Sequence, residues 1–216
     1  MRPPDPRRLV DGAAALGVAL TDEQTAQLLA YLALISKWNR VYNLTAVRDP
    51  SEMLQQHLLD SIAVIAPLLR WTGGGEPARV LDVGSGAGLP GVVIAALVPG
   101  LDVTCVDAVG KKSSFVRQVA GALALKNLHA AHSRVESLDG GPFDVVISRA
   151  FASLADFVSL SRRHMGPRSV WLAMKGRKPA DEIAALPPDI EVFHVEQLAV
   201  PGLDAARCLV WMRTLS

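Results

Sequence analysis

A glycine-rich stretch between two hydrophobic runs constrains the fold of this chain more than any other feature. Residues 79–97 read RVLDVGSGAGLPGVVIAAL, with apolar runs at 80–83 and 92–98 on either side of the glycines. Glycine lets the backbone turn tightly and approach a ligand closely. The free N–H groups at the start of the following helix can also bind a ligand. The segment therefore predicts an internal parallel strand, a turn and a helix that form a nucleotide-cofactor site.

Two cofactor classes fit this turn. Gly86, Gly88 and Gly91 match the pattern GxGxxG of dinucleotide-binding proteins. Asp82, however, lies two residues before the first glycine, where a carboxylate favours the cationic amino-acid group of S-adenosylmethionine over a pyrophosphate. The pattern favours a methyltransferase and leaves an NAD-type or flavin oxidoreductase, or a purely structural turn, as alternatives.

An acidic residue ends the second predicted strand. Residues 101–106 (LDVTCV) are followed by Asp107, sixteen residues after Gly91. A carboxylate at this place suits ribose hydroxyls, and both cofactor classes contain ribose. Asp107 therefore predicts a nucleoside without identifying it, and a helix cap is the structural alternative.

Composition indicates one sizeable domain with an appendage. The chain has 216 residues, of which 50% are hydrophobic, so we expect a substantial core. No segment approaches the roughly 20 apolar residues that span a bilayer, and the opening MRPPDPRR is too polar for a secretory signal. Only two cysteines occur and the five histidines do not cluster. We expect a cytoplasmic protein without a membrane segment or a metal site.

The charge balance limits how this chain can bind nucleic acid. Because the net charge is only +1, any RNA-binding surface must be a local patch. Basic residues cluster at 7–8, 111–112, 162–163 and 175–178. Each pair taken alone is more typical of a solvated helix face than of an RNA contact.

The first seventy residues are helical in pattern. Residues 21–24 (TDEQ) and 49–52 (DPSE) are capping boxes, and the second opens a helix that we expect to run to about Leu69. The sequence TGGG at 72–75 then breaks the chain. We therefore predict a helical extension over residues 1–72 and a second domain over residues 73–216.

Strands and helices alternate in the second part. We expect strands at 79–83, 102–106, 128–132, 143–148 and 169–174, and helices at 90–98, 111–125 and 153–165. This alternation predicts a parallel sheet with helices on both faces. The tail, with strands at 190–198 and 206–213, predicts a closing antiparallel pair at the sheet edge.

The residues that end these strands are polar or charged. Parallel sheets bind ligands outside the carboxyl ends of their strands. The residues at those ends are Asp82, Asp107, the segment 134–136, Ser148 with Arg149, and Lys175. Together they predict a ligand with several polar groups, although any one of them could form a structural ion pair.

Seven ordered segments of this chain resemble one known family. They are KWNRVYNLTAV (37–47), HLLDSI (57–62), DVGSGAGLPG (82–91), KKS with Phe115 (111–115), SRVE (133–136), FDVVISRAFASL (143–154) and AMKG (173–176). The chain resembles the bacterial small-subunit (16S) ribosomal RNA guanine-N7 methyltransferase G family, also called glucose-inhibited division protein B. The resemblance implies an α/β, Rossmann-like class I S-adenosylmethionine-dependent methyltransferase domain with a mostly parallel sheet and an N-terminal helical extension.

The resemblance also implies a cofactor, a partner and a set of site residues. S-adenosyl-L-methionine would be the methyl donor, and 16S ribosomal RNA or a small ribosomal subunit particle would be the partner. The cofactor-binding residues would be Gly84 and Leu89 in the turn, Val135 and Glu136 beside the adenine, and Arg149 after the fourth strand. From the residues themselves we add Asp82 and Asp107 at the strand ends and Gly86 in the glycine turn.

Methylation at guanine N7 needs no general base, because N7 carries a lone pair and no proton. We expect the protein to act by aligning the reactants. Arg149 would orient cofactor and base, while Lys175 would donate to guanine O6 or to a phosphate, with an ion pair as its structural alternative. A non-catalytic RNA-binding assembly factor with this fold is a further alternative.

Three polar residues lie on one side of the helix that Pro50 opens. His57, Asp60 and Ser61 are spaced at i, i+3 and i+4. A buried group that docks the helix on the sheet and a direct RNA contact are equally compatible with this pattern.

Overall fold

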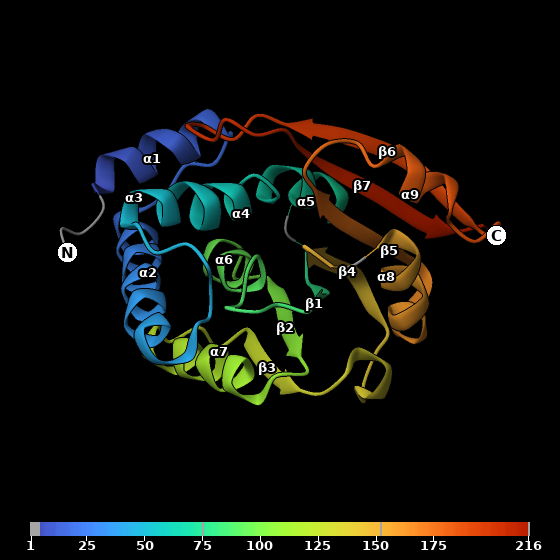
Figure 1. Ribbon diagram of the computed structural model, residues 1–216, viewed down its shortest axis with the longest axis horizontal. Coiled ribbons are helices and arrows are strands. Elements are labelled where there is room, and N and C mark those ends of the chain that lie inside the picture. Colours follow the sequence, from blue (N-terminus) through green and yellow to red (C-terminus); the bar gives the residue numbers. More distant parts are fainter. Residues whose placement is uncertain (1–4, 75, 152, 216) are drawn as a thin grey trace.

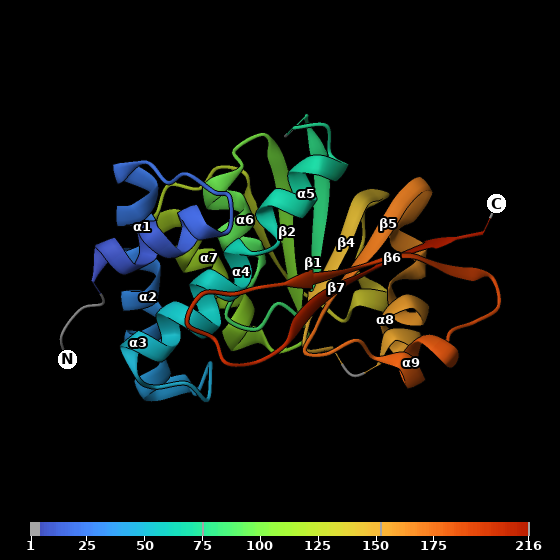
Figure 2. The ribbon, with the colours of Figure 1, turned by 90° about the horizontal axis from the view of Figure 1, so that it is seen from above.

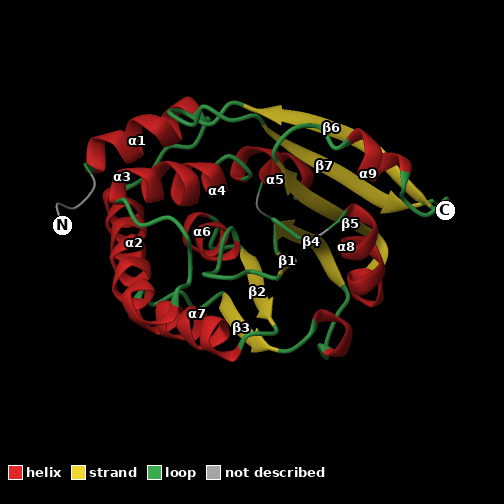
Figure 3. Cartoon of the chain, viewed as in Figure 1, coloured by secondary structure: helices red, strands yellow, loops and turns green. Residues whose placement is uncertain are grey.

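The computed structural model describes residues 5–74, 76–151 and 153–215. Figures 1 and 3 show a sheet with helices packed on both faces. The helices are α1 (Pro6–Ala15), α2 (Asp22–Tyr42), α3 (Pro50–Met53), α4 (Asp60–Ile62), α5 (Ile65–Trp71), α6 (Gly91–Leu97), α7 (Gly110–Ala122), α8 (Leu154–Ser161) and α9 (Ala180–Ala184). The strands are β1 (Ala78–Val83), β2 (Leu101–Asp107), β3 (Leu128–His132), β4 (Phe143–Arg149), β5 (Met165–Lys175), β6 (Ile190–Leu198) and β7 (Arg207–Thr214).

The sheet has the strand order β3-β2-β1-β4-β5-β7-β6. Strands β1 to β5 pair in parallel, whereas β7 pairs antiparallel with both β5 and β6. The predicted parallel sheet with a closing antiparallel pair is therefore confirmed. The strand order reverses between β1 and β4, which is where open sheets of this kind hold their ligands.

Alternation within each strand divides the core into two layers. Val80, Val103 and Val145 face one side, where they pack with α6, α7 and the N-terminal helices. Leu81 and Val146 face the other side, where they pack with α8. Figure 1 shows α4, α5 and α6 on one side of the sheet and α8 on the other.

The N-terminal helices pack on the α6–α7 side of the sheet. A capping box fixes the start of α2, with Thr21 accepting from the Gln24 backbone N–H and the Gln24 side chain accepting from the Thr21 N–H. The buried face of α2 includes Leu28 and Tyr31, which share a core with Val92 and Phe115 of the sheet domain. Figure 2 shows α1, α2 and α3 at one end of the molecule. The division between 1–72 and 73–216 stays a prediction, and Gly75 lies outside the described residues.

The helix expected from Pro50 to about Leu69 is interrupted. It consists of α3, a π-helical segment (Leu54–Leu59), α4 and, after a turn, α5. Each piece buries apolar side chains, which explains why the hydrophobic pattern reads as continuous. A π segment contains one extra residue and re-aims the side chains around it, and such segments are frequent at functional sites.

Two other expected boundaries differ. The helix expected at 153–165 ends at Ser161, and a short 3-10 turn (Arg162–His164) leads into β5, which begins at Met165. Helix α9 was not predicted, because its five residues bury no side chain and so carry no apolar period. None of the described helices is long and apolar enough to cross a membrane.

Candidate active site at the carboxyl edge of the sheet

The glycine turn lies at the carboxyl end of β1, where the strand order reverses. The backbone N–H groups of Gly84 and Ser85 donate to the carbonyl oxygen of Val106, at 2.9 and 3.2 Å, which fixes the turn against β2. Leu89 is buried within the same turn, with 4% of its surface exposed. The turn is thus anchored against β2.

Asp82 lies beneath the turn and not on its open side. Its carboxylate is fully buried and accepts a hydrogen bond of 2.8 Å from the backbone N–H of Gly91, at the start of α6. Burial raises the pKa of Asp82 to about 7, although this hydrogen bond and Arg149 act in the opposite direction. The placement does not support the expected direct attraction of Asp82 for an amino-acid group, and assigns it to holding the turn on the helix.

The glycines of the turn have two separate roles. A side chain at Gly91 would collide with Cys105 and Asp82, so this glycine is needed for packing. Gly86 has a φ of +60°, and a Cβ built there would meet nothing closer than the Gly84 carbonyl oxygen at 4.0 Å. A Cβ at Gly84 would lie 3.4 Å from the ring of Phe151. We call the open space above Gly86 the cradle.

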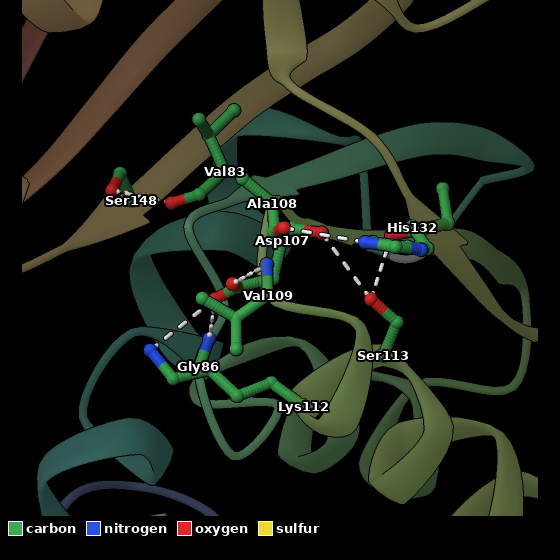
Figure 4. A network of polar contacts seen from close by, with 10 residues as sticks. Val83, Gly86, Asp107, Ala108, Val109, Lys112, Ser113, His132 and Ser148 are labelled. Carbon is green, nitrogen blue, oxygen red and sulfur yellow. Dashed lines mark hydrogen bonds and ion pairs between the residues drawn. The ribbon is translucent and has the colours of Figure 1, made fainter.

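Asp107 faces this cradle from the end of β2. Its carboxylate accepts from the backbone N–H groups of Gly86 at 3.0 Å and Val109 at 2.8 Å, and lies 3.7 Å from the Lys112 ammonium. Figure 4 shows these contacts, together with the Ser113 hydroxyl that donates to the Asp107 carbonyl oxygen. The donors hold the carboxylate beside the turn, a position compatible with the expected ribose partner. The alternative of a helix cap is wrong, because Val109 is the N-cap of α7 and no side chain of the described residues caps this helix.

The segment that contains Val135 and Glu136 forms a short 3-10 turn after β3. Val135 is buried and its carbonyl oxygen lies 2.8 Å from Nε2 of the fully buried His164. Glu136 is exposed, and its carbonyl oxygen accepts from Arg163 at 2.5 Å. Two side chains from the 3-10 turn before β5 therefore fix the backbone of this segment.

Arg149, at the end of β4, is joined to the N-terminal part of the chain. Its Nη1 donates to the Gln56 carbonyl oxygen at 2.8 Å and to Asp60 Oδ2 at 3.0 Å. The other Asp60 oxygen accepts from Nε of Arg207 at 2.8 Å. Ala150, directly after Arg149, has a φ of +58°, a conformation that non-glycine residues rarely adopt and that concentrates at functional sites.

The three polar residues of the helix after Pro50 are all buried but serve different contacts. Asp60 binds the two arginines, whereas His57 Nε2 lies 3.0 Å from the Thr45 hydroxyl. Within the described residues, His57 Nδ1 and Ser61 Oγ have no hydrogen-bond partner. Burial, followed by the charge of Arg149, lowers the pKa of His57 to about 4. His57 is therefore neutral near pH 7.

Lys175, at the end of β5, is held in an ion pair. Its ammonium lies 2.7 Å from Glu182 Oε2 of α9, and the same oxygen accepts from the backbone N–H of Leu154 at 2.8 Å. The side chain of Lys175 is 13% exposed. The structure therefore places this lysine in the ion pair that the sequence left as the alternative to a substrate contact.

A pocket of about 410 Å³ opens beside these groups. Its lining comes from the π-helical segment, α4 and the ends of β4, β5 and β7, and includes His57, Asp60, Arg149, Lys175 and Arg207. This volume lies within the roughly 300–1,000 Å³ of small-molecule sites. Arg149, which lines the pocket, ends strand β4, and β4 pairs with β1, the strand that leads into the glycine turn.

Arg207 and Gln56 belong to this site but were not predicted. Arg207 begins a strand that runs antiparallel to β5, so its amino end lies at the carboxyl edge of the parallel strands. The predicted antiparallel closing pair was the signal that could have identified it. Gln56 contributes only its backbone carbonyl oxygen to Arg149, and no side-chain motif marks such a contact. No group of three metal-ligating side chains occurs among residues 5–74, 76–151 and 153–215.

Comparison of the sequence with known families and proteins gives concordant results. The model of a family described as GidB, rRNA small subunit methyltransferase G, matches residues 24–210. A ribosomal RNA small subunit methyltransferase G of Leptothrix cholodnii is 61% identical, covering 99% of this chain and 97% of the relative. The protein of that name from Acidovorax ebreus is 60% identical over 96% of this chain and 95% of the relative.

Solved structures share the fold at low sequence identity. A SAM-dependent methyltransferase from Aquifex aeolicus superposes with a TM-score of 0.58 at 19% identity, covering 79% of this chain and 96% of that chain. A mutant of MtNAS in complex with S-adenosylmethionine gives a TM-score of 0.60 at 14% identity, covering 97% and 89%. These likenesses show a Rossmann-like class I methyltransferase fold.

Proposed function

This chain belongs to the GidB family, rRNA small subunit methyltransferase G, and we propose that it methylates N7 of a guanine in small-subunit (16S) ribosomal RNA. The chain is an S-adenosylmethionine-dependent methyltransferase of ribosomal RNA. Family membership does not support the two alternatives, an NAD-type oxidoreductase and a non-catalytic assembly factor. The observation that carries the proposal is the family match across residues 24–210, which contains every strand-end residue of the site.

The cofactor site that we propose is the cradle above Gly86. When bound there, S-adenosylmethionine supplies the methyl group. The open space at Gly86 and the carboxylate of Asp107 beside it fit a nucleoside with ribose hydroxyls. Gly84, Leu89 and the backbone of Val135 and Glu136 would enclose the rest. Asp82 would act indirectly, by holding the turn on α6.

The target base would enter the pocket of about 410 Å³ beside Arg149. A base that is stacked inside an RNA helix cannot reach such a pocket, so the guanine would have to be unstacked. Unstacking costs a few kcal/mol in a duplex and less in a loop. Since N7 has a lone pair and no proton, the residues around it must orient the base and leave that lone pair free. Holding the methyl donor and the base in the geometry of the reaction can supply an effective molarity of roughly 10⁵ M or more.

Arg149 is the residue that we assign to both reactants. It ends β4, the strand beside β1, and lines the pocket, and Asp60 together with the Gln56 carbonyl oxygen fixes its guanidinium. Lys175 is committed to Glu182, so we place it at the wall of the pocket, near RNA phosphate. The exposed Arg177 and Lys178, which follow β5, add positive charge to this rim.

The proposed partner is small-subunit ribosomal RNA, either free or in an assembling particle, and a ribosomal substrate implies a cytoplasmic protein. The test is transfer of labelled methyl groups from S-adenosylmethionine to small-subunit particles purified from cells that lack this protein. We expect one 7-methylguanosine per particle. Incorporation into free 16S RNA but not into particles, or the reverse, would identify the form of the substrate.

A further inference from the structure

Arg207 lies at the carboxyl edge of the parallel strands, and the proposed function gives it no role. It is the first residue of β7, and its neighbour Cys208 pairs with Lys175 at the end of β5. The antiparallel direction of β7 therefore brings an arginine to the edge where the parallel strands end. Arg207 lines the same pocket as Arg149, and its side chain is 25% exposed.

The cations around the pocket differ in the hydrogen bonds that they still have to offer. Lys175 binds Glu182 at 2.7 Å. Arg149 uses only Nη1 for contacts within the described residues, so Nε and Nη2 stay side by side and open. Arg207 uses Nε for Asp60 at 2.8 Å and Nη1 for the Ala206 carbonyl oxygen at 2.9 Å. In the part of the chain that the structure describes, Nη2 is thus the nitrogen of Arg207 that makes no contact, while Nη1 keeps its second N–H.

A single donor suits guanine methylation at N7 better than a fork does. An arginine with two open donors binds O6 and N7 of guanine together. That contact would occupy the N7 lone pair, which has to attack the methyl group. Because Nε and Nη1 of Arg207 each bind a protein oxygen, an approach through Nη2 can bind O6 and leave N7 free. Adenine carries an amino group at the place of O6, so the same donor would disfavour adenine.

We propose that Arg207 is a specificity-determining residue whose Nη2 donates to O6 of the target guanine, and that Asp60 is the positioning residue that holds it. This inference rests on the proposed function of the same site. Asp60 is suited to positioning because its side chain is 4% exposed and both of its oxygens are bound, one by each arginine. The carboxylate therefore fixes Arg207 and Arg149 relative to each other across the pocket.

The experiment compares two substrates in single turnover. One is a small-subunit particle reconstituted with RNA that carries guanine at the mapped target position. The other carries 2-aminopurine, which keeps N7 and lacks O6. With the parent protein, loss of O6 should slow methyl transfer at least about tenfold, because a hydrogen bond to a charged group is lost. Arg207→Ala should lose about the same factor on guanine and nothing further on 2-aminopurine.

Arg213→Ala is the matched control. Arg213 lies at the other end of β7, and its Nε also binds a carboxylate, Glu191, at 2.7 Å. This variant should transfer methyl groups like the parent and discriminate between the two substrates like the parent. Both arginine variants should bind S-adenosylmethionine as tightly as the parent, which separates Arg207 from the cofactor site.

Three results would overturn the assignment of Arg207. Independent, multiplicative losses from Arg207→Ala and from 2-aminopurine would show that the residue does not contact O6, as would an unchanged rate in the variant. Weaker cofactor binding in Arg207→Ala, with parental binding in Arg213→Ala, would place Arg207 in the cofactor site. If Arg207→Ala does not fold, Arg207→Lys keeps a cation beside Asp60 and should show the same insensitivity to O6. Failure of the parent to methylate the guanine particle would instead contradict the proposed function.

Discussion

Tyr31 of α2 donates a hydrogen bond of 2.6 Å to the carbonyl oxygen of Ala87 in the glycine turn, across 56 residues of sequence. Both groups are buried, and the Tyr31 ring stacks on Phe115 of α7 with 6.4 Å between ring centroids. The N-terminal helices therefore contact the cofactor turn directly. They contribute to the shape of the site as well as to the core.

Replacing Tyr31 by Phe keeps the ring and removes the hydroxyl. The buried Ala87 carbonyl oxygen would lose its partner, so we expect the free energy of unfolding to fall by about 1–3 kcal/mol, together with weaker binding of S-adenosylmethionine. Chemical denaturation and calorimetric titration measure the two effects. Tyr42→Phe, at a tyrosine that is 41% exposed, is the control and should change neither. Equal unfolding free energies for the two variants would contradict this role of Tyr31.

The cradle at Gly86 predicts a variant that folds but does not bind the cofactor. In Gly86→Leu the side chain would occupy the open space, and the φ of +60° adds strain of about 1–3 kcal/mol. Gly17→Leu is the matched control, because Gly17 has a φ of +76° and open space around its Cβ, in the loop before α2. Both variants should lose similar stability, while only Gly86→Leu loses S-adenosylmethionine binding in titration. Parental affinity in Gly86→Leu would show that the cofactor binds elsewhere.

The buried carboxyl of Asp82 predicts a pH dependence of stability. In the unfolded chain this carboxyl ionises near its ordinary pKa of 3.8, whereas burial raises the pKa to about 7 in the folded protein. The folded state therefore holds the proton over this window, and the stability that Asp82 contributes is lost as the pH rises through it, by up to about 1.4 kcal/mol per pH unit. Asp82→Asn cannot ionise and should gain stability relative to the parent between pH 4 and pH 7.

The variant must be compared with the parent because His57 changes the unfolding free energy with pH in the opposite direction. Its pKa falls from 6.5 to about 4 on folding, so the stability that it contributes is present above pH 6.5 and is lost as the pH falls toward 4. The difference between Asp82→Asn and the parent cancels that contribution. A difference in unfolding free energy that does not vary between pH 4 and pH 7 would contradict the raised pKa of Asp82.

The sequence predicted the sheet and the cofactor turn because both depend on local patterns. Apolar strands such as 80–83, separated by helices, leave few ways to build the sheet, and glycines directly after such a strand favour a turn that approaches a ligand. The acidic residue at the end of β2 could also be placed from the strand boundary alone. Asp107 accordingly lies beside Gly86, at a hydrogen-bond distance of 3.0 Å.

Contacts between elements that are distant in the chain could not be predicted from the sequence. The link from Asp60 to Arg207 joins residues 147 positions apart and depends on how β7 pairs with β5. The ion pair of Lys175 depends on Glu182 in α9, whose five residues are too few to show an apolar period. The burial of Asp82 beneath the turn, and not above it, follows from the packing of α6 on the sheet.

Arg149 and Lys175 should respond differently to truncation. Arg149→Ala removes a group that lines the pocket and leaves Asp60 with Arg207 alone. We expect weaker S-adenosylmethionine binding and slower methyl transfer even with saturating RNA. Lys175→Ala should leave cofactor binding unchanged and weaken RNA affinity, with a salt slope that falls by less than one unit because Glu182 already neutralises the charge. Parental cofactor affinity and single-turnover rate in Arg149→Ala would show that Arg149 does not touch the reactants.

The central claim, that this site transfers a methyl group to N7 of a guanine in small-subunit RNA, is tested most directly by mapping the product. Small-subunit particles from cells that lack this protein are incubated with the purified protein and labelled S-adenosylmethionine, and the RNA is digested and analysed by mass spectrometry. We predict a single 7-methylguanosine in the 16S RNA, absent before incubation and absent with Gly86→Leu. A methyl group on any other atom or RNA, or no incorporation by the parent protein into either the particles or free 16S RNA, would contradict it.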